Sequence, residues 1–248
     1  MIQIALLHLG YMAQILPSIS LAKYLRKETE KYGLKSEITF VLSDHKYCYI
    51  NKYNKDIYET IPIEKFVNSD KKYHAVIDLF PIFPQNEKIK LKIHDFMPKY
   101  FSHVFENISE ETCKSIDTSK MNIFQFYCLM AGLTWKGKGY DIRYFPKNKT
   151  KKGRIGISVS NANLRNYVLD SLEMDSQKIW YVPYKKNIFK KMDEINRCEK
   201  IVTDDLTTFH LSMSLRKYVY FLETTPLKFK LEMFGNGQIH KVPSIVFQ

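Results

Sequence analysis

Short apolar runs alternate with helix-like amphipathic segments along the whole chain. Residues 2–7 form a continuous apolar run, and apolar positions at helical spacing follow through Ile15 and Leu25 to Gly33. Further apolar runs predict strands at 37–42, 57–61, 74–79, 154–160, 178–182, 200–203 and 218–222. Helical patterns lie at 122–133, 164–172, 188–196 and 207–215. This order predicts an α/β protein whose parallel sheets are covered on both faces.

A stretch rich in glycine and lysine interrupts the alternation. Residues 136–153 hold three of the nine glycines, and most of the lysine run at 147–154 lies within them. This composition is typical of an exposed linker. We therefore predict an N-terminal lobe at 1–135, a linker at 136–153 and a C-terminal lobe at 154–248.

Composition narrows the function only in part. A net charge of +12 favours an anionic partner, whether nucleic acid, acidic lipid or a phosphorylated substrate, although a general lysine bias produces the same total. The cysteines (Cys48, Cys113, Cys128 and Cys198) lack C-x-x-C spacing, which favours reduced cytoplasmic thiols over a metal site or a disulfide framework. No apolar stretch approaches the roughly 20 residues of a membrane span, and the apolar start favours a first strand over a signal peptide.

Three predicted strand-to-helix turns hold the candidate chemistry: 8–11, 160–163 and 204–210. Ligands of open parallel sheets bind at the carboxyl ends of strands, where helix N-termini offer N–H groups to phosphates. The third turn would place a carboxylate, hydroxyls and a cationic His210 around one pocket. Thr207 and Thr208 also fit the purely local role of helix N-caps.

Four motifs occur in a telling order. Leu9-Gly10-Tyr11 follows the first strand, with Leu16-Pro17 one helical turn further on. Ser160 and Asn161 follow the first strand of the second lobe, and Arg165 and Tyr167 lie in the next helix. Asp205 precedes His210 by five residues, and 234–238 reads Phe-Gly-Asn-Gly-Gln. In this order the motifs resemble the bacterial heptosyltransferases, glycosyltransferase family nine.

The resemblance implies a fold and a reaction. The fold is α/β of the GT-B type: two Rossmann-like lobes with parallel sheets facing a cleft, here with an abbreviated C-terminal lobe. The reaction is metal-independent, inverting transfer of a sugar, a heptose among the candidates, from a nucleotide-activated donor to a hydroxyl of a surface glycan, lipid-linked glycan or protein. No cofactor, metal or specific nucleic acid is expected. The implied location is cytoplasmic, with peripheral contact at an anionic membrane.

The resemblance also implies the site residues. The substrate-binding set is Gly10, Asp78, Ser160, Asn161, Arg165, Asp205, Thr207, Thr208, His210, Asn236 and Gly237. Arg165 stands where the family has a lysine, and a guanidinium can hold pyrophosphate oxygens at two places. His210 and the backbone at Thr207 and Thr208 would hold the phosphates or the sugar, and Asp205 would accept hydrogen bonds from donor hydroxyls.

Two positions depart from the family pattern. Tyr11 stands where the family has its acidic base, and a phenol with a pKa near 10 is a poor base at neutral pH. We therefore predict a catalytic pair of His8 and Tyr11, since imidazole has a suitable pKa. The other candidate bases are Asp44, His45, Asp78, His94 and Asp95. Thr207 replaces a family glycine, which narrows the approach of a phosphate to the backbone.

Two alternative functions stay open. A catalytically silent scaffold that binds a nucleotide sugar would explain the loss of the acidic residue. Nucleic-acid binding through the basic surface has charge in its favour but no recognisable motif. The absence of G-x-G-x-x-G disfavours a dinucleotide-dependent oxidoreductase, and no D-x-D spacing suggests a metal-dependent transferase.

Overall fold

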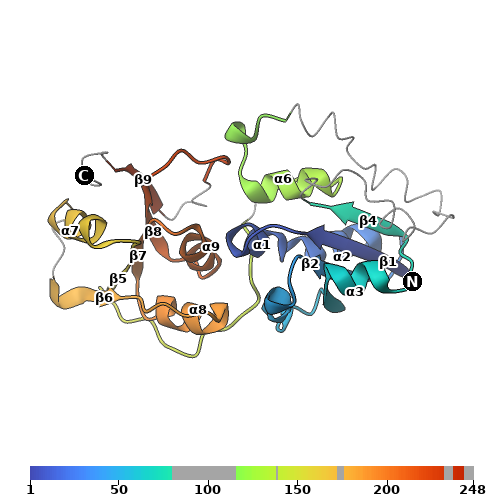
Figure 1. Ribbon diagram of the computed structural model, residues 1–248, viewed down its shortest axis with the longest axis horizontal. Helices are drawn as coiled ribbons and strands as arrows, with labels where there is room; N and C mark the ends of the chain where they lie inside the picture. The colour runs from blue at the N-terminus through green and yellow to red at the C-terminus, as the bar shows by residue number, and fades with distance from the viewer. Residues whose placement is uncertain (80–115, 138, 172–175, 232–236, 243–248) are drawn as a thin grey trace. The chain divides into compact units, whose positions relative to one another are not determined.

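Two compact units, each with its own parallel sheet, make up the chain (Figure 1). The computed structural model describes residues 1–79, 116–137, 139–171, 176–231 and 237–242. The first unit is Met1–Lys138 and the second Gly139–Gln248. The predicted α/β class with parallel sheets is confirmed. The candidates His94, Asp95 and Asn236 lie outside the described residues.

The first unit has four parallel strands in the order β3-β2-β1-β4. Their bounds are β1 (Ile2–His8), β2 (Ser36–Leu42), β3 (Glu59–Pro62) and β4 (Ala75–Asp78). The α-helices are α1 (Met12–Ser18), α2 (Leu21–Glu30), α3 (Ile63–Asn68) and α6 (Ile123–Met130), and the 3₁₀ helices are η1 (His45–Asn51) and η2 (Thr118–Lys120).

The apolar strands of this unit bury side chains on both faces of the sheet. Ala5, Leu7 and Val41 pack with Phe66 of α3 and with Tyr73. The alternate residues of β1 and β2 are also fully buried, because successive side chains of a strand point to opposite faces. A sheet covered on both faces accounts for continuous apolar runs in place of a polar-apolar alternation.

The single helix predicted between 15 and 33 is in fact two, α1 and α2. Pro17 lies inside α1, and a proline there removes a backbone donor and crowds the carbonyl of the preceding turn. The Ile19 N–H bonds instead to the Leu16 carbonyl, and the Ser18 hydroxyl donates to Ile15 O. Helix α1 ends at Ser18, one residue after the proline, and α2 begins at Leu21.

The second unit has five parallel strands in the order β6-β5-β7-β8-β9. Their bounds are β5 (Ile155–Ser158), β6 (Ile179–Tyr181), β7 (Lys200–Thr203), β8 (Tyr218–Glu223) and β9 (Gly237–Lys241). The helices are α7 (Ala162–Ser171), η3 (Ser176–Lys178), α8 (Ile188–Asn196) and α9 (Leu206–Ser214). In Figure 1, α7 covers one face of the sheet and α8 and α9 cover the other.

Close packing in the middle of this sheet requires a glycine. A β-carbon on Gly156 of β5 would lie 2.7 Å from Ile201 Cδ1, 2.9 Å from Cys198 Sγ and 3.1 Å from Val182 Cγ2. Cys198 is fully buried, and burial raises the pKa of its thiol to about 11. Gly156 therefore brings β5 close to the chain that leads from α8 into β7.

Much of the predicted linker runs along α8 in the second unit. The Tyr144 hydroxyl donates to Asp193 Oδ1 at 3.0 Å, and the Lys147 N–H donates to the same oxygen at 2.7 Å. The Thr150 hydroxyl donates to Asn196 O at 2.9 Å. These bonds fix the lysine-rich segment to the last turn of the helix.

Candidate functional site

Each sheet has a topological switch point, where the chain continues on the other side of a strand. In the second unit the chain passes from β5 to β6 on one side and returns to β7 on the other side of β5. In the first unit the corresponding point lies between β1 and β4. Ligands of open α/β sheets bind beyond the carboxyl ends of the strands at such points.

Hydrogen bonds join the turns that follow β5 and β7. The Thr203 hydroxyl donates to Ser158 O at 2.7 Å, and the Ser160 N–H donates to Asp204 Oδ1 at 3.1 Å. Asn161 Oδ1 accepts from the Leu164 N–H at 2.8 Å and so caps the first turn of α7. The structure thus brings together two turns that are more than 40 residues apart in the sequence.

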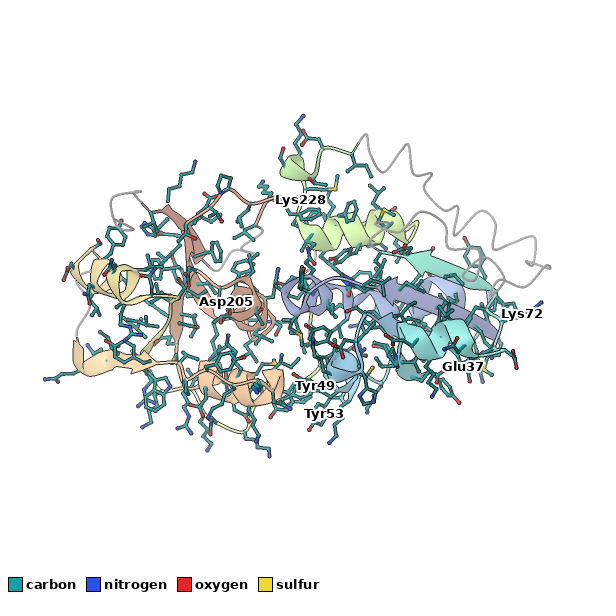
Figure 2. The ribbon with its side chains drawn as sticks, in the orientation of Figure 1. Glu37, Tyr49, Tyr53, Lys72, Asp205 and Lys228 are labelled. Atoms are coloured by element: carbon teal, nitrogen blue, oxygen red, sulfur yellow. The ribbon has the colours of Figure 1, made fainter. Side chains whose placement is uncertain are left out.

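Asp205 is the N-cap of α9. Its carboxylate accepts from the Thr207 N–H at 3.2 Å, from the Thr208 N–H at 2.9 Å and from the Thr208 hydroxyl at 2.6 Å. The Lys191 ammonium donates to the same carboxylate at 2.9 Å. Figure 2 labels Asp205. Burial opposes the ionisation of Asp205, but Lys191 and Thr208 outweigh it and hold the pKa of the carboxyl below its ordinary value.

This cap corrects the roles expected of three residues. Thr207 and Thr208 are not the N-caps of α9, because Asp205 precedes them and accepts from both of their amides. Those amides are already bonded to a carboxylate, so they do not form a free cradle for a phosphate. The Asp205 carboxylate already accepts hydrogen bonds from the start of α9 and from Lys191, so it does not suit the expected role of binding the hydroxyls of a ligand.

Arg165 lies in the first turn of α7, at the same carboxyl edge. Its side chain is exposed, and its guanidinium lies over the ring of Tyr181 at 4.9 Å from the centroid. The first helical residues, Ala162 and Asn163, are exposed as well. The positive end of the helix dipole disfavours a cation at this place unless an anion binds beside it. The start of α7 therefore suits a phosphate better than the start of α9 does.

His210 of α9 is buried and neutral. Its Nδ1 hydrogen-bonds the hydroxyl of Tyr140, which is buried too. Burial lowers the pKa of His210 to about 3, although the charge of Asp205 raises it. The expectation of a cationic His210 is therefore wrong: desolvation removes the charge, and the ring packs beneath the site.

His8, at the end of β1, is enclosed in the same way. Its Nε2 lies 2.8 Å from the Tyr127 hydroxyl, which donates to Gln14 O, and its Nδ1 accepts from the Gly10 N–H at 3.2 Å. This arrangement fixes the proton on Nε2. Burial lowers the pKa of His8 to about 3, against the opposing effect of backbone hydrogen bonds. With both ring nitrogens engaged and no exposed surface, His8 does not suit the predicted role of base.

Gly10 and Tyr11 form the turn that follows. A β-carbon on Gly10 would lie 2.5 Å from Gln14 Oε1 and 2.8 Å from His8 Cε1, so glycine is needed here for packing. Tyr11 is the N-cap residue of α1 and is 79% exposed. Its side chain is open to solvent, and within the described part of the chain no ion pair or ring contact involves its phenol.

Among the other candidate bases that the structure describes, Asp78 lies nearest to the switch point of the first sheet. It ends β4 and is partly exposed, and its Cα pairs in register with Leu7 of β1. Asp44 instead follows β2, caps η1 and pairs with Lys46 at 2.7 Å. That hydrogen bond to Lys46 holds the pKa of Asp44 below its usual range and weakens it as a base. His45 is exposed within η1.

Gly237 lies at the other edge of its sheet. It begins β9 and pairs with Val219 near the start of β8, and all the strands of this sheet are parallel. It therefore shares an edge with the amino ends of the strands and not with Ser160 and Arg165. The expected donor contact at Gly237 is corrected, because Gly237 and Gln238, expected in a loop, begin strand β9 (Gly237–Lys241).

Lys191 and Tyr181 are site residues that the sequence reasoning missed. Lys191 lies in the apolar stripe of α8 with Ile188, Met192 and Ile195, and only 10% of its side chain is exposed. A lysine inside an apolar stripe indicates an acidic partner within reach, which is Asp205, whose side chain is 42% exposed. Tyr181 carries no comparable pattern in the sequence.

Two findings apply to the described residues alone. Across them, no three or more His, Cys, Asp and Glu side chains gather as a metal site. Within the same ranges, no helix combines the length and the apolar character needed to cross a bilayer.

Solved glycosyltransferases have a fold similar to that of this chain. It is similar to the E. coli heptosyltransferase WaaC with ADP-2-deoxy-2-fluoro heptose at a TM-score of 0.56 and 11% identity, covering 97% of this chain and 93% of that one. The chain has the heptosyltransferase fold. E. coli ADP-heptose LPS heptosyltransferase II gives a TM-score of 0.60 at 12% identity, with 98% and 91% covered.

A third solved structure extends the likeness beyond E. coli. The family 9 glycosyl transferase from Veillonella parvula DSM 2008 gives a TM-score of 0.59 at 14% identity, with 97% of this chain and 86% of that one covered. No protein-family model and no curated protein matches the sequence. At these identities the likeness establishes the fold, which confirms the GT-B expectation.

Proposed function

We propose that the chain is a glycosyltransferase whose nucleotide-sugar donor binds at the carboxyl edge of the second sheet. One observation carries the proposal: Arg165 and the exposed start of α7 lie at the switch point of a chain with the heptosyltransferase fold over 97% of its length. The acceptor is a hydroxyl of a surface glycan, lipid-linked glycan or protein. Transfer is metal-independent and inverting.

The chemistry of the leaving group supports this placement. Departure of a nucleoside diphosphate places negative charge on phosphate oxygens, and preorganised donors that meet this charge lower the barrier. The first turn of α7 supplies N–H groups and the positive end of the dipole. Arg165 supplies a guanidinium, and the ring of Tyr181 limits its freedom before the donor arrives.

The proposed base is Asp78. It is the candidate carboxylate at the end of a strand beside β1, and it replaces His8, whose burial excludes proton exchange with an acceptor. The carboxylate would take the proton of the acceptor hydroxyl as the sugar bond forms. Tyr11 has no assigned chemical role.

Donor binding is the first test. We expect the thermal midpoint of the full chain to rise with one class among ADP-, GDP-, UDP-, CMP- and CDP-sugars, since saturation at one hundred times Kd adds about 2.7 kcal/mol. ADP-heptose is tried first, because two solved structures similar to this chain contain ADP-heptose or a fluoro analogue of it. Arg165→Ala should raise Kd at least about tenfold. Lys190→Ala is the matched control, because it removes an exposed cation from α8 of the same unit.

The results separate the possibilities. A shift that Arg165→Ala abolishes and Lys190→Ala leaves intact supports the site. Equal binding by the two variants refutes the placement of the diphosphate. No shift with any nucleotide sugar refutes the proposed function.

A catalytically silent nucleotide-sugar-binding scaffold is the second candidate. Tyr11, 79% exposed, occupies the position of the family's acidic residue, and His8 is enclosed. This candidate predicts donor binding without release of nucleoside diphosphate under any acceptor condition. Measurable release that follows the concentration of an acceptor would exclude it.

A further inference from the structure

Three hydrogen-bonded residues lie beneath the turn that follows β1. The Tyr127 hydroxyl oxygen is 2.8 Å from His8 Nε2 and 3.0 Å from Gln14 O. Tyr127 belongs to α6, 119 residues after His8, and α6 packs against α1 within the first unit (Figure 1). One side chain of α6 therefore joins the end of β1 to the first turn of α1. The set of His8, Gln14 and Tyr127 is called the turn brace.

The backbone fixes the direction of each hydrogen bond in the turn brace. The Gly10 N–H donates to His8 Nδ1 at 3.2 Å, so the ring proton lies on Nε2 and points at the Tyr127 oxygen. Tyr127 donates its own proton to Gln14 O. Burial raises the pKa of Tyr127, so the hydroxyl keeps this proton. The chain of donors thus runs from Gly10 through His8 and Tyr127 to Gln14.

The turn brace holds residues 8–11 at both ends. His8 accepts from the Gly10 amide, and Gln14 Oε1 accepts from the Tyr11 N–H at 3.0 Å. A β-carbon on Gly10 would collide with these same two side chains, so the turn packs directly against them. Tyr127 bonds to both supports and therefore fixes where the turn lies.

Packing alone does not account for polar groups at this place. His8 and Tyr127 are both fully buried. Hydrogen bonds between buried polar groups do little more than offset the cost of removing them from water, and an apolar pair of the same shape can be equally stable. What a fully bonded buried network adds is a defined geometry for the groups that it joins. Here that geometry is the position of the turn.

The turn lies beside the proposed base. Asp78 of β4 pairs in register with Leu7, and the Leu79 N–H donates to Leu7 O at 2.9 Å, one residue before His8. An acceptor hydroxyl that approaches Asp78 comes to the edge formed by residues 8–11. Misplacement of reacting groups by about 1 Å can lower a rate about hundredfold. The position of this turn therefore matters for transfer.

We propose that Tyr127 is a positioning residue for glycosyl transfer, which holds residues 8–11 in place beside Asp78 through His8 and Gln14. The inference rests on the proposed function. Tyr127 is given no contact with either substrate. Loss of its hydroxyl should therefore lower turnover and leave donor binding unchanged, because the donor is assigned to the second unit.

Hydrogen exchange of the full chain, followed by NMR, tests the turn brace without any substrate. Tyr127→Phe keeps the ring and removes the bonds to His8 and Gln14. We expect the Gly10 and Tyr11 amides to exchange at least about tenfold faster, while amides in the middle of β1 keep their rates. Tyr73→Phe is the matched control, because Tyr73 is fully buried in the same unit and takes no part in these bonds. It should leave Gly10 exchange within about twofold of the parent.

Turnover tests the positioning role. The probe is ADP-heptose, or the nucleotide sugar that raises the thermal midpoint in its place. Tyr127→Phe should lower the release of nucleoside diphosphate at least about tenfold, with donor Kd within about twofold of the parent. In a His8→Gln background the same change should cost little more, because residues that act as one unit are not additive. Tyr73→Phe should release at the parent's rate, and thermal unfolding checks that each variant is folded.

The outcomes separate this inference from the proposed function. Unchanged exchange at Gly10 in Tyr127→Phe would overturn the turn brace, and faster exchange with unchanged release would overturn the positioning role. Fully additive losses in the double variant would show that Tyr127 does not act through His8, which also overturns the proposal. Failure of the proposed function is recognised in the parent itself, as the absence of any nucleotide-sugar binding, and the positioning role would fail with it.

Discussion

The two switch points have the same topology and opposite chemistry. At the first, His8 is buried with both ring nitrogens engaged, Gly10 is needed for packing, and Asp78 is the nearby carboxylate. At the second, polar groups hold two turns together and Arg165 extends from the start of a helix. A common fold therefore supplies the place, while the residues at each strand end decide which ligand can use it.

The two units also repeat a capping motif with different burial. Asp44 and Asp205 both follow a strand, cap a helix and pair with a lysine. The Lys46 side chain is 65% exposed, whereas that of Lys191 is 10% exposed. An exposed pair contributes little, while a buried cation that loses its partner is costly. The predictions below test these differences, starting with the largest expected effect.

Asp205→Ala should lower the free energy of unfolding by about 3 kcal/mol, because it removes the cap of α9 and leaves Lys191 buried without its partner. Asp205→Asn should cost less, since an acceptor oxygen remains. Urea titration measures both. Asp44→Ala is the control in the first unit, and a loss as large as that of Asp205→Ala would contradict the comparison.

Asp78→Asn should lower the turnover of donor at least about hundredfold, the usual contribution of a general base. Donor Kd should change little, because the donor contacts are assigned to the other sheet. Release of nucleoside diphosphate measures turnover, and calorimetry measures Kd. Unchanged turnover would remove Asp78 from the mechanism.

Acid should destabilise the protein through His8 and His210. Burial lowers the pKa of each to about 3, whereas the unfolded value is 6.5. Between these values the unfolded chain binds more protons than the folded one, so stability is complete above pH 6.5 and falls toward pH 3. Each histidine should cost about 2 kcal/mol at pH 5.

Urea unfolding at pH 7.5 and pH 5 checks this dependence. The free energy of unfolding of the parent should differ between the two pH values. His210→Gln should reduce this difference by the contribution of one histidine, about 2 kcal/mol. A pH-independent stability in the parent would show that neither ring is desolvated as the structure has it.

Tyr11→Phe should have the smallest effect, with turnover and donor Kd within about twofold of the parent, because the exposed hydroxyl has no assigned role. The same assays apply. A large loss of turnover would return Tyr11 to the catalytic set and weaken the case for Asp78.

The sequence was sufficient for most of the framework. Strands such as β1 and β7 are short apolar runs, and α8 shows a regular apolar stripe. The structure has each of these elements where the pattern predicts it. β9 was missed because Gly237–Lys241 has little apolar character. The break between Ser18 and Leu21 was missed because the apolar periodicity continues across it.

The candidate site was predictable only where its groups are local. The turns at Ser160 and at Asp205 were found from strand ends, but the environment of His8 depends on Tyr127, 119 residues away. No spacing reveals such a contact, and desolvation decides whether a histidine is a base or part of the core. The choice between Asp205 and the following threonines as N-cap likewise depended on where the helix begins.

The space around Gly156 limits how this chain can diverge. In a relative with a side chain at this position, the side chains at 201, 198 or 182 would have to be smaller than the present Ile201, Cys198 and Val182. Among relatives, these positions should therefore change together or not at all, whereas Tyr11 is free to vary. Correlated substitutions at Gly156 and these three neighbours would show that the packing contact limits which residues each position can hold.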